Sequence, residues 1–342
     1  MHKPQTTSAH VGISWDRPRD AVDRLAIIVP CCNEAEVLPL FHESLTAVLD
    51  TVAELDFEII FVESGSTDPT LDVLDELAEA DPRVRVYSLS RNHGHQMALT
   101  AGLDVARADA VVQMDCDLQH PPALLPQMIE LWREGHDVVS AVRQNTADAT
   151  FLRQLCSTGF YWLINRLSDT PIVAGAADFC LLSHRAHRAL QAMPERHRFL
   201  RGMISWIGFR RAFVPFEAPP RAAGESKYKL WRLVKFAVDA MFSFSARPIR
   251  IVGLLGMVIV ALGLLYTAYI LLHYLFLANP VQGWAPLMIT ILIVGGMQLV
   301  GIGISGEYIA RVFEESKGRP LYFFKQTPED ARPKRARLKR AA

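Results

Sequence analysis

The sequence predicts an α/β domain built on a mainly parallel sheet, followed by two membrane-spanning helices. Strand-like and helix-like stretches alternate between residues 25 and 141, a rhythm typical of βαβ units with right-handed crossovers. Two long apolar runs, 251–272 and 285–305, follow near the other end of the chain. Each run is long enough to cross about 30 Å of hydrocarbon as a helix.

The expected elements of the α/β domain follow one another in order. The strands are predicted at 25–29, 57–62, 84–89, 110–114 and 137–141, and the helices at 34–52, 68–80, 95–107 and 122–134. After Gln144 the pattern becomes helical and irregular, as an acceptor-binding half would be. About 250 residues precede the first apolar run, which is enough for one sizeable domain.

Both apolar runs lack the polar face of a surface helix. Residues 251–272 carry no charge, and Gln298 is the one strongly polar side chain in 285–305. A pair of buried core helices is the alternative, which two such uniformly apolar runs disfavour. Lys and Arg flank the runs but are absent from the link 273–284, so the positive-inside rule places the α/β domain and both termini in the cytoplasm. The protein is therefore expected in the inner (plasma) membrane, which the two helices would cross as a hairpin.

Composition excludes several classes of protein. The formal net charge is zero, so no nucleic-acid partner is expected. The five cysteines include no CxxC pair, which argues against a zinc site or a disulfide framework. Residues 1–24 are polar and lack an apolar core, so they predict a disordered N-terminus rather than a signal peptide.

Carboxylates follow the predicted strand at 110–114. Asp115 and Asp117 come directly after it, and Gln119 adds a side-chain carbonyl two residues further on. Oxygen donors on such a loop suit Mg²⁺ or Mn²⁺, metals that keep substrate phosphate oxygens in their remaining positions. The alternative is an Asx-type turn or a cap for the next helix. The longer string MDCDLQHPP favours the metal site.

Polar loops also follow the first three predicted strands. Their sequences are PCCNE at 30–34, ESGSTD at 63–68 and SRNHG at 90–94. Because the carboxyl ends of parallel strands share one edge, these loops should converge with the metal loop on a nucleotide-diphosphate site. None of these strand-end loops carries a GxGxxG or Walker sequence, which argues against a dinucleotide enzyme or a P-loop ATPase.

Residues 227–246 predict an amphipathic helix before the first apolar run. Its polar side chains recur every three or four residues as Lys229, Arg232, Lys235 and Asp239, and apolar side chains cover the remainder. A basic stripe beside an apolar face is typical of a helix lying in the headgroup plane of a lipid bilayer. The alternative is a helix packed on the α/β domain.

Several motifs, in order, resemble one family. They are PCCNEAE, VESGSTD, LSRNHGHQMALTAGLDVA, MDCDLQHPP, DFCLLSHRA, RFLRGMISWIGF, AGESKY and GEYIARVFEESKGRPLY. The set is similar to the family 2 polyisoprenyl-phosphate glycosyltransferases, akin to dolichyl-phosphate mannose synthase and bacterial undecaprenyl-phosphate sugar transferases. The resemblance covers roughly residues 25–324 and implies a GT-A fold.

The resemblance also implies a division of the chain into five parts. They are a disordered N-terminus (1–24), a GT-A glycosyltransferase domain (25–226), an interfacial amphipathic helix (227–248), a two-span transmembrane hairpin (249–309) and a cytoplasmic basic tail (310–342). A homo-oligomer, a tetramer by the same resemblance, is expected.

Site residues are implied by the same matching positions. The nucleotide sugar would be held by Pro30, Asn33, Glu34, Glu63 and Asp115. The divalent metal and the diphosphate would be held by Asp115, Asp117 and Gln119. The acceptor phosphate would be held by Arg143, Arg201, Ser226 and Lys227. Asp117 and Asp178 are the implied catalytic residues. For Asp178 two non-catalytic interpretations stay open: a salt bridge to Arg185, or a polar residue that merely begins a strand. Cys32 and Glu63-Ser64 depart from the aromatic residue and the Asp-Asp pair that the family usually carries there, which leaves the donor nucleotide, UDP- or GDP-linked, undecided.

The resemblance and the chemistry together predict metal-dependent, inverting transfer of a sugar from a nucleotide sugar to a membrane polyprenyl (undecaprenyl or dolichyl) phosphate. The product would be a lipid-phosphate-linked sugar for the cell envelope. A lipid monophosphate is largely dianionic at neutral pH and needs little help from a general base. Two alternatives stay open: a processive polysaccharide synthase, although its Gln-x-x-Arg-Trp sequence is missing, and a non-catalytic membrane scaffold.

Overall fold

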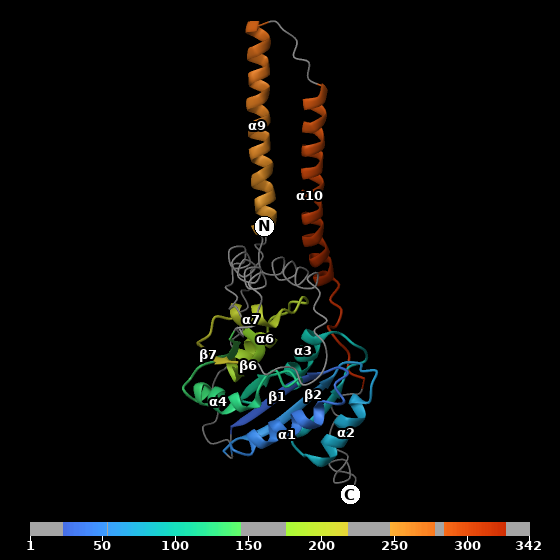
Figure 1. The fold of residues 1–342 in the computed structure, drawn as a ribbon, viewed down its shortest axis with the longest axis vertical. Helices are drawn as coiled ribbons and strands as arrows, with labels where there is room; N and C mark the ends of the chain where they lie inside the picture. The colour runs from blue at the N-terminus through green and yellow to red at the C-terminus, as the bar shows by residue number, and fades with distance from the viewer. Residues whose placement is uncertain (1–22, 53, 145–175, 218–246, 278–283, 326–342) are drawn as a thin grey trace, which may run out of the picture.

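The computed structural model describes residues 23–52, 54–144, 176–217, 247–277 and 284–325 (Figure 1). Its α/β domain is built on a seven-stranded sheet in the order β3-β2-β1-β4-β6-β5-β7. The strands are β1 (Arg24–Cys31), β2 (Asp56–Glu63), β3 (Val84–Ser88), β4 (Ala110–Gln113), β5 (Val138–Arg143), β6 (Ala176–Ser183) and β7 (Arg211–Phe216). The predicted disordered N-terminus and the interfacial helix at 227–246 lie outside the described residues, apart from Asp23 and Arg24.

The sheet is mainly parallel, as the alternating pattern predicted. β3, β2, β1 and β4 run parallel to one another, and β5 pairs parallel with β7. β6 is inserted antiparallel between β4 and β5. The carboxyl ends of β1, β2, β3, β4 and β5 therefore share one edge with the start of β6, and that edge carries the predicted site.

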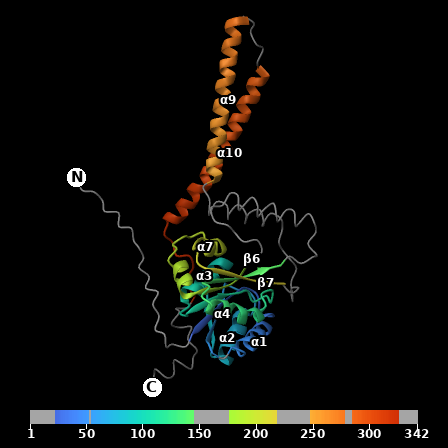
Figure 2. The ribbon, with the colours of Figure 1, turned by 90° about the vertical axis from the view of Figure 1, so that its left-hand side faces the viewer.

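Helices cover both faces of the sheet, which explains why its central strands are apolar throughout (Figures 1 and 2). In β1, Leu25, Ile27 and Val29 face one core, while Ala26 and Ile28 face the other. The first core is closed by α1 (Leu38–Leu49), α2 (Thr70–Ala80) and α4 (Leu125–Arg133), which follows a short 3₁₀ turn, Pro122–Leu124. The second is closed by α3 (His95–Val105), α6 (His184–Gln191) and α7 (Leu200–Trp206).

The prediction of a helical, irregular half after Gln144 needs correction, because two strands lie there. β6 contains the motif AADFCLLS and fills the middle of the sheet, while β7 forms an edge. β6 pairs with β4, far earlier in the sequence, and its short apolar run has no helical or alternating period of its own. Its neighbours therefore decide its conformation, and no local pattern identifies it.

Two long helices leave the α/β domain side by side, α9 (Arg247–Leu277) and α10 (Trp284–Ser316) (Figure 1). They contain the predicted apolar runs and extend beyond them at both ends. They approach closely at Gly301, where an added Cβ would lie 3.1 Å from Val252 Cγ1. Among the described residues, one helical segment, Ile293–Ser316, is long and apolar enough to cross a membrane, and the apolar segment of α9, Val252–Tyr266, is shorter.

The chain returns to the α/β domain after α10. The predicted boundary between hairpin and tail at 309/310 does not coincide with a helix end, because α10 continues to Ser316. Beyond the turn at Gly318, Phe324 pairs antiparallel with Leu89, next to edge strand β3. Tyr322 and Phe324 pack against the α/β domain, residues 317–320 are exposed, and 326–342 lie outside the described residues.

Candidate active site

The loop after β1 takes its shape from the loop after β2. Asn33 adopts a left-handed backbone with φ of 58°, which asparagine tolerates better than most residues. Its Oδ1 accepts a hydrogen bond from the Thr67 amide at 2.8 Å, and its own amide donates to Ser66 Oγ at 3.1 Å. The amide of Glu34 donates to Thr70 Oγ1 at 2.9 Å. Asn33 and Glu34, two predicted nucleotide contacts, thus share one braced loop at the expected edge.

Glu63 ends β2 and is 3% exposed. Its Oε1 accepts a hydrogen bond from the amide of Ser66, and its Oε2 accepts one from Ser88 Oγ at 2.5 Å. The carboxylate therefore joins the loop after β2 to the end of β3. Its contact with a nucleotide stays a prediction, and the structure shows its carboxylate bonded to Ser66 and Ser88 instead.

Gly65 lets the loops after β2 and β3 touch. Its φ is +63°, and an added Cβ would lie 2.5 Å from Asn92 N and 2.8 Å from the carbonyl carbon of Arg91. No side chain fits that space. Asn92 continues the contact across the edge, because its Nδ2 lies 3.4 Å from Cys32 Sγ. Three strand-end loops thus form one continuous surface.

The loop after β4 carries the predicted metal residues. The Gln119 amide donates to Asp117 Oδ1 at 3.0 Å, so the Asx-type turn weighed as an alternative is present. Leu118 within it has φ of 60°. His120 Nδ1 accepts the Asp115 amide at 2.9 Å, which places the ring proton on Nε2. His120 stacks on Phe179 of β6, with ring centroids 5.4 Å apart, so the metal loop is anchored to the neighbouring strand.

Three elements meet around Asp178 of β6. Arg201 of α7 binds it through two contacts, Nε to Oδ1 at 2.6 Å and a terminal nitrogen to Oδ2 at 3.0 Å. His95, the first residue of α3, places Nε2 3.5 Å from Asp178 Oδ2 and 3.5 Å from Asp115 Oδ1. The alternative salt bridge between Asp178 and Arg185 is absent, because Arg185 binds Asp137 instead.

Burial and charge set the protonation states in this cluster. Burial alone would raise the pKa of Asp178, but its contacts with His95 and Arg201 outweigh burial and lower the pKa well below its ordinary value. Burial raises the pKa of Asp115 against the opposing effect of His120 and His95. Burial lowers the pKa of His95, yet Asp178 and Asp115 reverse the balance and raise it. Asp178 is therefore an ionised hydrogen-bond acceptor.

The metal prediction can be tested against the polar atoms of this edge. Among the described residues, no group of three or more His, Cys, Asp or Glu side chains is arranged as a metal site. Asp115 Oδ1, however, is buried and accepts no hydrogen bond. Its ion-pair partner His95 Nε2 lies 3.5 Å away, beyond an ordinary hydrogen bond. A buried carboxylate oxygen that accepts no hydrogen bond is costly, and a divalent cation beside it would reduce the cost. Asp115 with Asp117 fits a magnesium-type site that takes one or two carboxylates and completes its shell with phosphate oxygens.

The remaining predicted residues lie in different places. Pro30 is buried within β1, where its carbonyl oxygen faces Cys116 Sγ at 3.6 Å. Arg143 ends β5 with an exposed side chain, on the same edge as Asp178. Ser226 and Lys227 lie outside the described residues.

Two histidines of this edge are not among the predicted catalytic, binding or metal residues. His95 sits in SRNHGHQ and His120 in DLQHPP, and neither motif identifies a partner for its histidine. Their contacts cross from α3 and the metal loop to β6, a strand that sequence patterns did not identify. Their position at strand ends was the one available signal.

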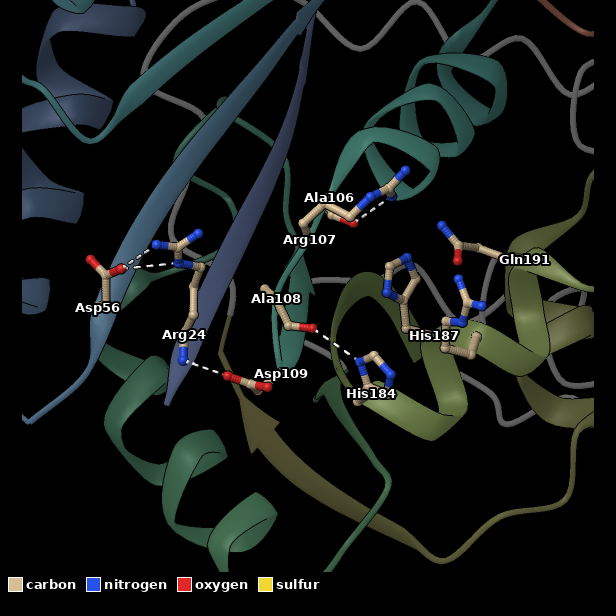
Figure 3. A pocket seen from close by; sticks show the side chains of 10 residues that line it. Arg24, Asp56, Ala106, Arg107, Ala108, Asp109, His184, His187 and Gln191 are labelled. Atoms are coloured by element: carbon tan, nitrogen blue, oxygen red, sulfur yellow. Dashed lines mark hydrogen bonds and ion pairs between the residues drawn. The ribbon is translucent and has the colours of Figure 1, made fainter. Parts of the chain in front are cut away.

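A hollow lies at the opposite, amino-terminal edge of the sheet (Figure 3). Arg24, Arg107, His184 and His187 are among the residues that line it. Most of these groups bind nearby protein atoms: Arg24 Nε donates to Asp56 at 2.9 Å, and the buried His187 Nε2 lies 2.7 Å from the carbonyl oxygen of Leu103. This hollow therefore lies at the opposite end of the strands from Asp115 and Asp117.

The chain is similar to known glycosyltransferases. Residues 26–190 match the family model described as Glycosyl transferase family 2, and residues 247–312 match the one described as GtrB C-terminal hairpin. The chain is 37% identical over 302 residues to a bactoprenol glucosyl transferase of Shigella phage SfV, covering 88% of this chain and 98% of that protein. It is 39% identical over 298 residues to an uncharacterized glycosyltransferase of Synechocystis, covering 87% and 93%.

Two solved structures also show similarity. One is a mannosyltransferase of Pyrobaculum calidifontis in complex with GDP-Man and Mn²⁺, with 22% identity, a TM-score of 0.43 and coverage of 66% of this chain and 64% of that one. The other is a glucosyl-3-phosphoglycerate synthase of Mycobacterium tuberculosis in complex with UDP, with 19% identity, a TM-score of 0.44 and coverage of 67% and 86%. The alignments with the Shigella phage and Synechocystis proteins have 37% and 39% identity and extend over nearly their full length. This chain is therefore a glycosyltransferase that belongs to glycosyl transferase family 2.

Proposed function

We propose that this glycosyltransferase moves a sugar from a nucleotide sugar to a polyprenyl phosphate in the bilayer, with inversion at the anomeric carbon. The observation that carries the proposal is the meeting of Asp115, Asp178 and Arg201 at the sheet edge. The chain that builds this cluster aligns with 98% of a protein named bactoprenol glucosyl transferase. Both a donor site and a lipid acceptor are thereby supported.

The donor half of the site is assigned to the braced loops. Asn33 and Glu34, shaped by Glu63, would face the nucleoside, and Asp115 with Asp117 would hold Mg²⁺ or Mn²⁺, assisted by Gln119. Such an ion neutralises the charge that develops on a leaving diphosphate. The buried oxygen of Asp115 that accepts no hydrogen bond and the turn that orients Asp117 support this assignment.

Asp178 is given an orienting role rather than that of a strong base. It is paired on both oxygens with Arg201 and its lowered pKa keeps it ionised, so it is a weak proton acceptor at neutral pH. An acceptor phosphate is itself a dianion at that pH and attacks without losing a proton. We infer that Asp178 fixes the direction of Arg201 and His95, which face the reacting groups.

Cations are needed to hold the acceptor phosphate. Arg201 and Arg143 lie on the correct edge, and Ser226 and Lys227 are added as a proposal from the AGESKY motif. The two helices α9 and α10 are proposed to span the membrane as a hairpin, with the catalytic domain in the cytoplasm and the interfacial segment 227–246 at headgroup depth. A homo-oligomer is part of the same proposal.

A transfer assay tests the function and its rivals together. Membranes that contain the protein are incubated with a panel of labelled nucleotide sugars and then extracted with organic solvent. Label in the lipid fraction supports the proposal and identifies the sugar. Label in polymer would instead favour a processive synthase, and label in neither fraction would favour a scaffold.

A further inference from the structure

The segment that leaves the membrane helix touches the catalytic domain at two separated places. We define the strap as residues 314–325, which comprise the end of α10, the turn at Gly318 and the strand-like stretch beyond it. Figure 1 shows it descending from α10 to the side of the domain that carries α3.

The first contact extends the sheet. The Ser90 amide donates to the carbonyl oxygen of Phe323 at 2.8 Å, and the Lys325 amide donates to the carbonyl oxygen of Ser88 at 2.8 Å. Side chains alternate as in a strand: Tyr322 and Phe324 pack on the second core, while Phe323 is 57% exposed. The strap therefore occupies an edge that would otherwise expose unpaired backbone groups.

This edge leads directly into the donor site. Ser88, which receives the Lys325 amide, also donates its Oγ to Glu63, the residue that shapes the loop after β2. Ser90, which donates to Phe323, begins the loop that packs against Gly65 and ends at His95. Displacement of the strap would release the amino-terminal end of this loop.

The second contact involves the connection between α6 and α7. Glu315 Oε1 accepts the Arg196 amide at 2.7 Å, and Glu314 Oε2 lies 2.8 Å from His197 Nε2. α7 begins three residues later and carries Arg201. The strap thus touches the segments that deliver both partners of Asp178, since His95 follows the loop after β3 and Arg201 follows this connection.

One further bond ties the strap to α3 itself. Tyr322 Oη donates to Asp104 Oδ2 at 2.7 Å, near the carboxyl end of the helix that begins at His95. Tyr322 and Phe324 contact each other with ring centroids 5.2 Å apart, and Phe324 reaches Tyr87 of β3 at 5.7 Å. α3 and β3 are held as a unit by two neighbouring aromatic residues.

We propose that the strap is a positioning element that couples the membrane helix α10 to the active site by holding the loop after β3 and the start of α7, and through them His95 and Arg201, against Asp178. The expected change in kcat rests on the proposed function. The expected change in amide hydrogen exchange rests on the geometry alone. Tyr322 is a positioning residue in this scheme, because it acts through α3 and touches no reacting atom.

The test compares three variants of the full-length protein in bilayer nanodiscs. Amide hydrogen exchange is followed at residues 88–95 and 196–203 without substrate, and kcat and donor KM are measured with a nucleotide sugar and polyprenyl phosphate. Tyr322→Ala is expected to speed exchange in both segments, beginning at the Ser90 amide, and to lower kcat about tenfold. Tyr322→Phe keeps the ring and loses one hydrogen bond, so it should recover activity to within about threefold of the unaltered protein. Phe323→Ala, whose exposed ring neighbours the same backbone, should change neither readout.

Several results would overturn the proposal. They are unchanged exchange in Tyr322→Ala, faster exchange with unchanged kcat, or an equal loss in Phe323→Ala. If Tyr322→Ala does not accumulate, Glu315→Ala serves in its place, with faster exchange at 196–203 and a lower kcat expected. If the unaltered protein transfers no sugar to polyprenyl phosphate, the proposed function fails, while the exchange comparison still decides whether the strap holds the two segments.

Discussion

Arg201 binds both carboxylate oxygens of Asp178, through Nε at 2.6 Å and a terminal nitrogen at 3.0 Å. The pair joins α7 to β6 at the sheet edge where the loops after β1, β2, β3 and β4 converge. A planar guanidinium matched to a carboxylate fixes direction as well as charge, which a lysine ammonium cannot do. If Arg201 contacts the acceptor as proposed, a bond inside the protein orients this side chain before any substrate arrives.

Replacement of Arg201 by Lys should expose this directional role. We expect kcat/KM for the acceptor to fall about ten- to a hundredfold, since one charge-assisted contact of about 1.5–3 kcal/mol is lost while the charge remains. Asp178→Asn should cause a loss of similar size. Donor affinity, measured by calorimetry, should change little in either variant. A selective loss of donor binding would contradict the assignment.

Gly65→Ala should damage the donor site rather than the fold at large. The new Cβ would meet Asn92 N at 2.5 Å, so the loops after β2 and β3 must separate. We expect donor Kd to rise at least about tenfold, with a loss of stability of about 1–3 kcal/mol from the strained backbone. Gly135→Ala is the control, because Gly135 also has positive φ, +88°, but an added Cβ there meets nothing closer than 3.8 Å. Equal effects of the two changes on donor Kd would refute the loop contact.

Because His187 is buried, we expect the protein to lose stability in mild acid. Burial is the main cause that lowers the pKa of this 2% exposed residue to about 4, and the positive charges of Arg107, Arg188 and His184 add to it. The unfolded chain binds the proton near pH 6.5, so between about pH 6.5 and 4 it binds more protons than the folded chain. The folded state should lose up to about 3 kcal/mol as the pH falls through this window.

Thermal unfolding at pH 7 and pH 5 checks this expectation. His187→Gln should flatten the difference in Tm between the two pH values, whereas His184→Gln, which alters an exposed histidine of the same helix, should retain it. An unchanged difference in His187→Gln would assign the acid sensitivity to other groups.

The metal assignment makes a separate prediction. Asp117→Asn removes a carboxylate from the loop after β4 and should lower transfer by at least about a hundredfold, and a chelator should do the same to the unaltered protein. Mn²⁺ titration in the presence of a nucleoside diphosphate provides a readout besides activity, with binding lost in the variant. Asp56→Asn, on the opposite edge of the sheet, is the matched control. Full activity in chelator would remove the metal from the account.

The sequence predicted the part of the fold that is local. The strands at 25–29, 57–62 and 84–89 and the helix that begins at His95 are all present, because each has its own apolar period and turn residues. β6 was missed because its place depends on β4 and β5, distant in sequence, rather than on its own pattern.

The candidate site divides in the same way. Asp115, Asp117 and Gln119 follow one strand, so their proximity could be predicted from the chain order. The Asp178 cluster could not, because His95 and Arg201 reach it from α3 and α7 across the unpredicted strand β6. The pairing of the strap with β3 could not be predicted for a similar reason. It is made through backbone atoms, and the short stretch 321–325 has no sequence pattern that identifies its partner strand.

The most direct test of the central claim uses purified protein, a single nucleotide sugar identified by the panel, a divalent cation and defined polyprenyl phosphate. Products are extracted and analysed by mass spectrometry. The account predicts a polyprenyl-phosphate-linked single sugar whose formation requires the lipid phosphate and is lost in Asp117→Asn. Release of nucleotide at the same rate with and without the lipid, or growth of a sugar polymer, would contradict it.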